Sequence, residues 1–273
     1  MKVYISVDME GITGITSGLQ IERSGKEYER ARKLMAMETN AAVEGALAAG
    51  ATEVVVNDSH DDMANILLEE LNPAAVLITG HLKRMSMVEG LDETYDAAFF
   101  VGYHARAGAR GVLSHTYSMN SVVSVEINGG PASEALINAG VAGSLGVPVV
   151  LVTGDRTAVE EARKGLGGWV ETVVTKEPAG RYAAKCFHPQ VVSKMVREAA
   201  ERALRNLSSA RPFVFAEPTT VEIVFRDDSM ADRAELMPGV ERVSERTCRY
   251  IAPDYRTAYR GLRVMVALAD ACP

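Results

Sequence analysis

Short hydrophobic runs alternate with helical patterns along the first part of the chain. Apolar runs typical of strands buried on both faces occur at residues 2–7, 53–57, 75–79, 97–102 and 147–155. Apolar residues at helical spacing predict helices at 27–49, 65–71 and about 132–145. The alternating run at 121–128 predicts another strand, which ends in a turn. Strands that alternate with helices indicate an α/β fold: a mainly parallel sheet with helices on both faces.

The pattern changes after Pro178. A long amphipathic helix is expected at about 189–206, a strand at 219–225 and a last helix at about 254–269. No low-complexity linker separates the two parts. We therefore expect an α/β core of residues 1–178 and a smaller C-terminal α+β part of the same unit, residues 179–273.

Composition and charge narrow the class of protein. The 273 residues are 47% hydrophobic and 24% charged, as in ordinary globular domains. A net charge of −7 argues against a nucleic-acid-binding surface. No apolar run approaches the roughly 20 residues of a membrane helix, and the amino terminus lacks the pattern of a secretory signal. Because the 3 cysteines are scattered, as in proteins of reducing compartments, we expect a cytoplasmic protein.

Metal-type ligands follow three of the predicted strands. Asp8 and Glu10 come after the first strand, His60 ends the segment after the second, and His104 follows the strand at 97–102. Taken singly, each is most often a solvated or hydrogen-bonded structural residue. The carboxyl ends of parallel strands share one edge of a sheet, however, and that edge is where ligands bind in open α/β folds. The coincidence therefore favours a metal site in the core.

The number and type of these side chains indicate two metals. Glu134, in the first turn of a predicted helix, adds a fifth candidate ligand. Two carboxylates in a water-poor cleft repel each other, and a divalent cation removes that penalty. Imidazole and carboxylate ligands suit Zn²⁺, with Mn²⁺, Fe²⁺ or Co²⁺ as alternatives. Five ligands exceed the needs of one catalytic zinc but suit two ions about 3.5–4 Å apart, with Asp8 as the natural bridge.

The remaining histidines have different expected roles. His115 lies in a predicted loop, close enough in sequence to His104 to reach the same cleft. It is either a surface histidine or a residue for proton transfer or nucleophilic attack. His81 and His188 have no acidic neighbour at ligand spacing and are interpreted as structural. Asp58 is either a turn residue or a group that orients an imidazole.

The joint pattern resembles a known family. The segments SVDMEG, NDSH, GYHARA and SHT, with the Ser-Glu pair that opens the helix at Glu134, are similar to the zinc D-aminopeptidases of peptidase family M55. The similarity extends to GKEYERARKLM and VAGSLGVPVVLVTGD. It covers essentially the whole chain and is weaker after about residue 178.

The resemblance implies a site, an activity and an assembly. It implies two zinc ions per subunit, bridged by Asp8, with Glu10 and His60 on one ion and His104 and Glu134 on the other. His115 would be the catalytic histidine. The implied activity is removal of an amino-terminal D-amino acid, typically D-alanine, from short peptides. The implied assembly is a decamer of two stacked pentamers, without nucleic acid or membrane partners.

Other functions fit the bare ligand set. A two-metal hydrolase could act on another amide, on an ester or on L-peptides, since pocket shape decides between D and L substrates. A metal-stabilised assembly without catalysis is a third hypothesis. Open metal positions and His115 favour an enzyme.

Overall fold

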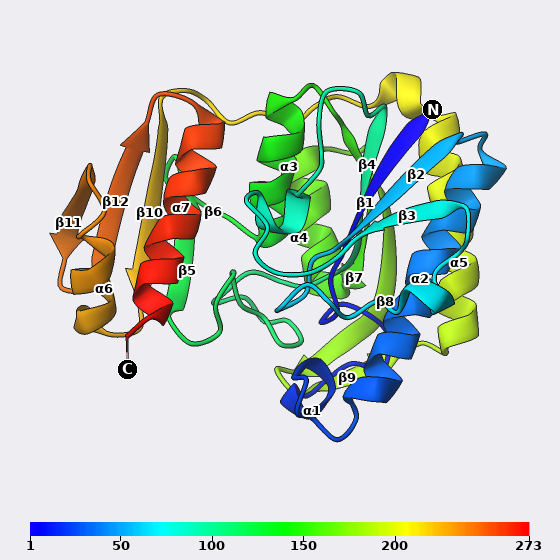
Figure 1. The fold of residues 1–273 in the computed structure, drawn as a ribbon, viewed down its shortest axis with the longest axis horizontal. Helices are drawn as coiled ribbons and strands as arrows, with labels where there is room; N and C mark the ends of the chain where they lie inside the picture. Colours follow the sequence, from blue (N-terminus) through cyan, green and yellow to red (C-terminus); the bar gives the residue numbers. More distant parts are fainter. Residues whose placement is uncertain (273) are drawn as a thin grey trace.

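Two β-sheets organise the chain (Figure 1), and the computed structural model describes residues 1–272. The larger sheet has the strand order β3-β2-β1-β4-β7-β8-β9. Its strands are β1 (Lys2–Val7), β2 (Glu53–Asp58), β3 (Ala75–Ile78), β4 (Ala97–Tyr103), β7 (Val149–Asp155), β8 (Glu171–Gly180) and β9 (Ala183–Cys186). All neighbours pair in parallel except β9, which is antiparallel to β8.

Helices cover both faces of this sheet, as Figure 1 shows. One face is covered by α2 (Tyr28–Ala48) and α5 (Pro189–Arg205), and the other by α3 (Glu134–Ser144) and α4 (Arg156–Leu166). The period of two in a strand divides β1 between the two cores. Val3, Ile5 and Val7 pack with α2 and α5, whereas Tyr4 packs with α3 and α4. The predicted fold class is confirmed.

The smaller sheet is antiparallel and lies beyond α3 (Figure 1). In sheet order its strands are β11 (Val240–Ser244), β12 (Thr247–Ala252), β10 (Thr219–Phe225), β5 (Val122–Ile127) and β6 (Gly130–Pro131). Two helices pack on it, α6 (Asp228–Ala234) and α7 (Tyr255–Asp270). The strand expected at 121–128 therefore belongs to this sheet and not to the parallel one. Val122, Val125 and Ile127 are buried, whereas Val123 and Glu126 are exposed, as expected for an antiparallel strand with one solvated face.

One predicted helix is wrong. Residues 65–71 form only a 3₁₀ turn, Leu68–Glu70, because the backbone is extended at Leu67 and again at Leu71, which leaves too few residues between them for an α-helix. Other short segments are α1 (Gly18–Ile21) and 3₁₀ turns at Ser86–Val88 and Leu207–Ser209. None of the helices in residues 1–272 combines the length and the hydrophobicity that a membrane span requires.

Candidate metal centre

The carboxyl ends of three neighbouring strands form the base of the site. β2, β1 and β4 lie side by side, with Val7 in register with Asp58 on one side and Val101 on the other. The chain therefore leaves all three strands at the same edge of the sheet. This edge carries Asp8 and Glu10 after β1, His60 after β2 and His104 after β4.

Asp8 lies between the two imidazoles. Its Oδ1 is 3.3 Å from His60 Nδ1, and its Oδ2 is 3.3 Å from His104 Nε2. Glu10 Oε2 is 2.9 Å from His60 Nδ1, on one side of Asp8. Glu134 Oε2 is 3.4 Å from His104 Nε2, on the other side. The five predicted ligands are thus brought together, with the short carboxylate in the middle.

The helix dipole and a backbone amide hold Glu134. Ser133 caps α3 by accepting a hydrogen bond from the backbone N–H of Leu136, so Glu134 occupies the first turn, where a carboxylate is favoured. The backbone N–H of Tyr117 donates to Glu134 Oε1 at 2.6 Å. The other oxygen, Oε2, is left to face His104.

Backbone carbonyls orient both imidazoles. His60 Nε2 lies 2.9 Å from the carbonyl oxygen of Ile21, and His104 Nδ1 lies 3.0 Å from that of Ala105. A carbonyl can only accept, so each of these ring nitrogens carries the proton of the neutral ring. The second nitrogen of each ring then presents a lone pair to the carboxylates, as in histidines that bind metals.

Two buried carboxylate oxygens of the site have no hydrogen bond. Asp8 Oδ2 and Glu10 Oε2 receive none from the described residues, although each lies near an imidazole nitrogen. A lone pair facing an anionic oxygen is unfavourable unless a cation lies between them, and buried acceptors are rarely left unpaired. One ligand atom each from Asp8, Glu10 and His104 lie within 4.8 Å of one another, as do those of His104, His115 and Glu134. The donor set and its spacing fit zinc.

Without a cation, the charges in the cluster shift every pKa. Burial and the neighbouring Glu10 raise the pKa of Asp8 to about 7. Burial alone would lower the pKa of His104, but Glu134 and Asp8 raise it to about 10. Glu10 and Asp8 likewise outweigh burial and raise the pKa of His60 well above its ordinary value. In the absence of metal, the site therefore binds protons, and a divalent ion would displace them.

His115 lies beside the five ligands and is the most accessible member of the group. Its side chain is 12% exposed, against 5% or less for the five others. Its ring stacks on His104 at a centroid distance of 4.0 Å, and its Nε2 is 3.8 Å from Glu134 Oε1. Nδ1 donates to the carbonyl of Leu113 at 2.8 Å. Burial and the neighbouring His104 lower the pKa of His115 to about 4, so near neutrality its Nε2 is a free acceptor.

A buried lysine that no sequence pattern indicates supports the loop after β1. Lys176 on β8 is fully buried, and its Nζ donates to the carbonyl oxygens of Glu10, Ile12 at 2.7 Å and Ile15 at 2.6 Å. Burial lowers the pKa of Lys176 to about 8. A lysine in the apolar run of β8 was the only available signal, and it does not reveal what the lysine contacts.

Glycine brings this loop against β4. The backbone N–H of Gly11 donates to the carbonyl of Gly102 at 2.7 Å, and Thr175 Oγ1 donates to the carbonyl of Gly11 at 2.5 Å. A Cβ atom at Gly11 would overlap the carbonyl oxygen of Tyr103, and one at Gly102 would overlap that of Asp8. Only glycine allows this close approach of two main chains.

Asp58, His188 and His81 lie away from the five ligands or contact other groups. Asp58 does not contact an imidazole; it accepts hydrogen bonds from the backbone and side chain of Asn65 and from the backbone of Ile66. His188 caps α5. His81, interpreted as structural, lines the cavity above the ligands.

A cavity of about 700 Å³ opens onto the ligands. Its wall carries six carboxylates: Asp8, Glu10, Glu22, Asp61, Glu134 and Asp270. One arginine, Arg263, also lines it and lies over the ring of Tyr117 at 4.8 Å. Three of the carboxylates are candidate ligands, and the other three leave the cavity acidic. Such a wall favours a cationic group on whatever binds there.

Known proteins match this chain over its whole length. The family model of the M55 peptidases, described as D-aminopeptidase, matches residues 1–264. A D-aminopeptidase of Bacillus subtilis (strain 168) is 40% identical over 270 residues, which are 98% of each chain. A solved structure of a Zn-dependent D-aminopeptidase, DppA from Bacillus subtilis, described as a self-compartmentalizing protease, matches with a TM-score of 0.97 and 40% identity. It covers 100% of this chain and 99% of that one. The chain belongs to the M55 family of D-aminopeptidases.

Proposed function

We propose that the protein is a zinc-dependent aminopeptidase that removes an amino-terminal D-amino acid, of the D-alanine type, from short peptides. The observation that carries the proposal is the convergence of five metal-type ligands, two of them with unpaired buried oxygens, at the base of an acidic cavity. Family membership and the zinc-dependent relative support the same function.

The proposed site holds two zinc ions. Asp8, which has an imidazole near each oxygen, would contact both ions. Glu10 and His60 would complete one position, and His104 and Glu134 the other. Zinc bound there supplies positive charge that polarises the scissile carbonyl and promotes ionisation of an attacking water.

His115 is the proposed catalytic residue. Its Nδ1–H is held by the Leu113 carbonyl, so Nε2 carries the lone pair of the neutral ring. It can therefore take a proton from water and return it to the leaving amine. We expect His115→Ala to retain zinc and to lose turnover. Full turnover would remove His115 from the mechanism, and lost zinc would make it a ligand.

The acidic cavity supports an exopeptidase. The carboxylates that are not candidate ligands, Glu22, Asp61 and Asp270, line the wall through which a peptide's ammonium group would approach. An amino-blocked peptide lacks this charge, so we expect it not to be cleaved.

One comparison of substrates tests the proposal. The zinc-loaded protein is incubated with D-Ala-D-Ala, L-Ala-L-Ala and an amino-blocked D-peptide, and free amino acid is measured. We expect release from D-Ala-D-Ala alone. Cleavage of only the L-peptide or only the blocked peptide would contradict the assignment and favour a two-metal hydrolase of another specificity.

We further propose that the chain assembles as a decamer of two stacked pentamers whose sites face an internal chamber. The description of the Bacillus subtilis structure as self-compartmentalizing supports such an assembly. Light scattering on the protein as it elutes from a size-exclusion column tests the assembly. The expected mass is that of ten 29.4 kDa chains.

A further inference from the structure

A second cavity adjoins the first across His115. It has a volume of about 520 Å³, and three residues line both cavities: His115, Met119 and Asn120. A molecule held at the metal ligands and extending past His115 would therefore enter this second space. We call it the arginine cavity, after Arg181 and Arg226 in its wall.

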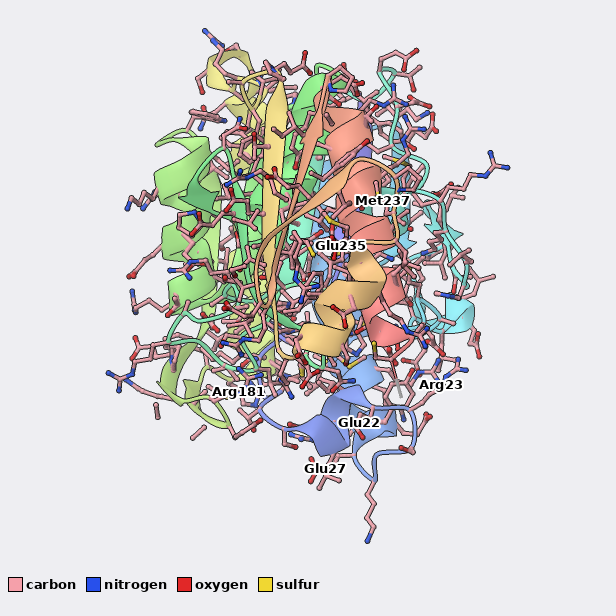
Figure 2. All side chains as sticks on the ribbon, turned by 90° about the vertical axis from the view of Figure 1, so that its left-hand side faces the viewer. Glu22, Arg23, Glu27, Arg181, Glu235 and Met237 are labelled. Carbon is pink, nitrogen blue, oxygen red and sulfur yellow. The ribbon has the colours of Figure 1, made fainter. Side chains whose placement is uncertain are left out.

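The two cavities have opposite charge. Apart from the three candidate ligands, whose charge bound zinc would offset, the wall of the first contains three carboxylates, Glu22, Asp61 and Asp270, and one arginine. The arginine cavity is lined by two arginines and, among its described lining residues, by no carboxylate. Figure 2 shows Arg181 at the same end of the molecule as Glu22, which lines the acidic cavity. Because His115 lines both cavities, the sign of the charge changes across this residue.

Hydrogen bonds fix both guanidinium groups and leave some of their N–H donors free. Arg181 Nη1 donates to the carbonyl of Ser114 at 2.6 Å and its Nε to Tyr182 Oη at 3.2 Å, while its Nη2 has no partner among residues 1–272. Arg226 Nη2 donates to the carbonyl of Met119 at 2.6 Å, and its Nε and Nη1 make no hydrogen bond within the same range.

Neither arginine is neutralised. No aspartate or glutamate of the described chain lies within ion-pair distance of Arg181 or Arg226, whereas Arg156, Arg242 and Arg249 all form such pairs. A guanidinium has five N–H donors and binds planar carboxylates in a two-pronged arrangement. The wall of this cavity is therefore suited to a carboxylate anion.

We propose that the arginine cavity binds the carboxyl-terminal carboxylate of the peptide substrate. This inference rests on the proposed aminopeptidase function. A short peptide is a dipole with an ammonium group at one end and a carboxylate at the other. The acidic cavity attracts the ammonium group and the arginine cavity attracts the carboxylate. The peptide therefore binds across His115 in a single orientation, with its amino end at the metal ligands. The arginines thereby select short peptides with a free carboxyl end.

The test compares peptide acids with their amides. The zinc-loaded enzyme is given D-Ala-Gly, D-Ala-Gly-Gly and D-Ala-Gly-Gly-Gly, each as the free acid and as the carboxyl-terminal amide, and kcat/KM is measured. For at least one length we expect the acid to be preferred about tenfold. In the double variant Arg181→Gln/Arg226→Gln the preference should disappear through a loss on the acid alone.

The ratio of kcat/KM for the acid to kcat/KM for the amide distinguishes a role of the arginines in substrate binding from a role in supporting the loop. Arg181 and Arg226 also hold the carbonyls on either side of His115. Loss of that support would lower hydrolysis of acid and amide equally and leave their ratio unchanged. Arg256→Gln is the matched control, because Arg256 is an exposed arginine outside both cavities. It should leave the ratio as in the unaltered protein.

Three outcomes would overturn the inference. Equal hydrolysis of acid and amide at every length would refute it and leave the proposed function standing. A preference lost in Arg263→Gln but kept in the double variant would place the carboxylate in the acidic cavity. Hydrolysis of no D-peptide at all would refute the proposed function and this inference with it.

Discussion

Two buried aspartates at the ends of adjacent strands have opposite surroundings. Asp58, at the end of β2, is fully buried and accepts three hydrogen bonds, from the side chain and backbone of Asn65 and the backbone of Ile66. Asp8, one residue beyond β1, is as deeply buried, but its Oδ2 accepts none. The two strands are neighbours in register, so their position in the fold does not distinguish them.

The difference lies in unused hydrogen-bonding capacity. A buried carboxylate whose oxygens are all engaged organises a turn, and its environment is complete. A buried carboxylate with an unpaired oxygen, next to other carboxylates and to imidazole lone pairs, requires something that the chain does not supply. Burial and residue type alone would have assigned both aspartates to the same role.

Replacing Asp8 should have the largest effect. Asp8→Ala removes the only carboxylate that faces both imidazoles, so we expect loss of both zinc ions and a fall in turnover of about a thousandfold or more. Zinc per subunit and kcat/KM measure this. Glu10→Ala should lose mainly one ion. Two ions retained in Asp8→Ala would refute its bridging position.

Replacing Asp58 should affect folding instead. Asp58→Ala leaves three buried donors without an acceptor, so we expect a loss of about 3 kcal/mol in the free energy of unfolding. Zinc content should stay near that of the unaltered protein, and urea unfolding gives the energy. If the variant instead lost its zinc at unchanged stability, the contrast between the two aspartates would fail.

Replacing Lys176 tests whether the loop after β1 needs the hydrogen bonds of this lysine to hold its metal ligands in place. Lys176→Met removes a donor from three loop carbonyls and leaves those of Glu10 and Ile15 unpaired, so we expect the ion proposed at Glu10 and His60 to bind roughly 10- to 100-fold more weakly. The ion proposed at His104 and Glu134 should be affected less. Zinc titration against a competing chelator resolves the two. Lys185→Met, an exposed lysine on β9, is the matched control.

The pH dependence of the metal-free protein should give the smallest effect. The raised pKa values of His60 and His104 mean that the folded state binds protons more tightly than the unfolded chain. That stabilisation is complete below the ordinary histidine pKa and is lost as pH rises toward about 10.

Between pH 7 and 10 we therefore expect the melting temperature of the metal-free protein to fall relative to that of the zinc-loaded protein, by about 5 °C. The lowered pKa of Lys176 acts in the opposite direction over this range, but it is shared by both forms and cancels in the difference. The zinc-loaded protein should change less, because its imidazoles are already deprotonated. Calorimetry on both forms measures the difference, and equal slopes would show that the imidazoles are not the cause.

The positions of the candidate ligands followed from the sequence because they depend on local and topological rules. Asp8, His60 and His104 follow recognisable strands, and parallel strands end at one edge. The contact between Lys176 and the loop joins residues 166 positions apart, and no local pattern indicates it. The arginine cavity was missed for the same reason.

Two errors in the fold have particular causes. The strand at 122–127 pairs with β10, almost a hundred residues later, and periodicity does not identify a partner. The helix expected at 65–71 fails because the backbone is extended at Leu67 and at Leu71, which limits the helical stretch to one 3₁₀ turn. The apolar pattern of the segment was compatible with a helix, but it does not reveal these backbone conformations.

The contact between the two main chains at Gly11 and Gly102 limits how far the metal ligands on either side of it can move apart, and so limits the radius of the ion that they can hold. Side chains between the loop and β4 would yield to a larger ion, but two backbones in contact leave nothing to compress. Zinc accepts ligands at about 2.0–2.2 Å, whereas calcium needs about 2.3–2.6 Å. A protein engineer who wished to exchange the metal would therefore begin with these glycines, and only afterwards with the residues that bind it.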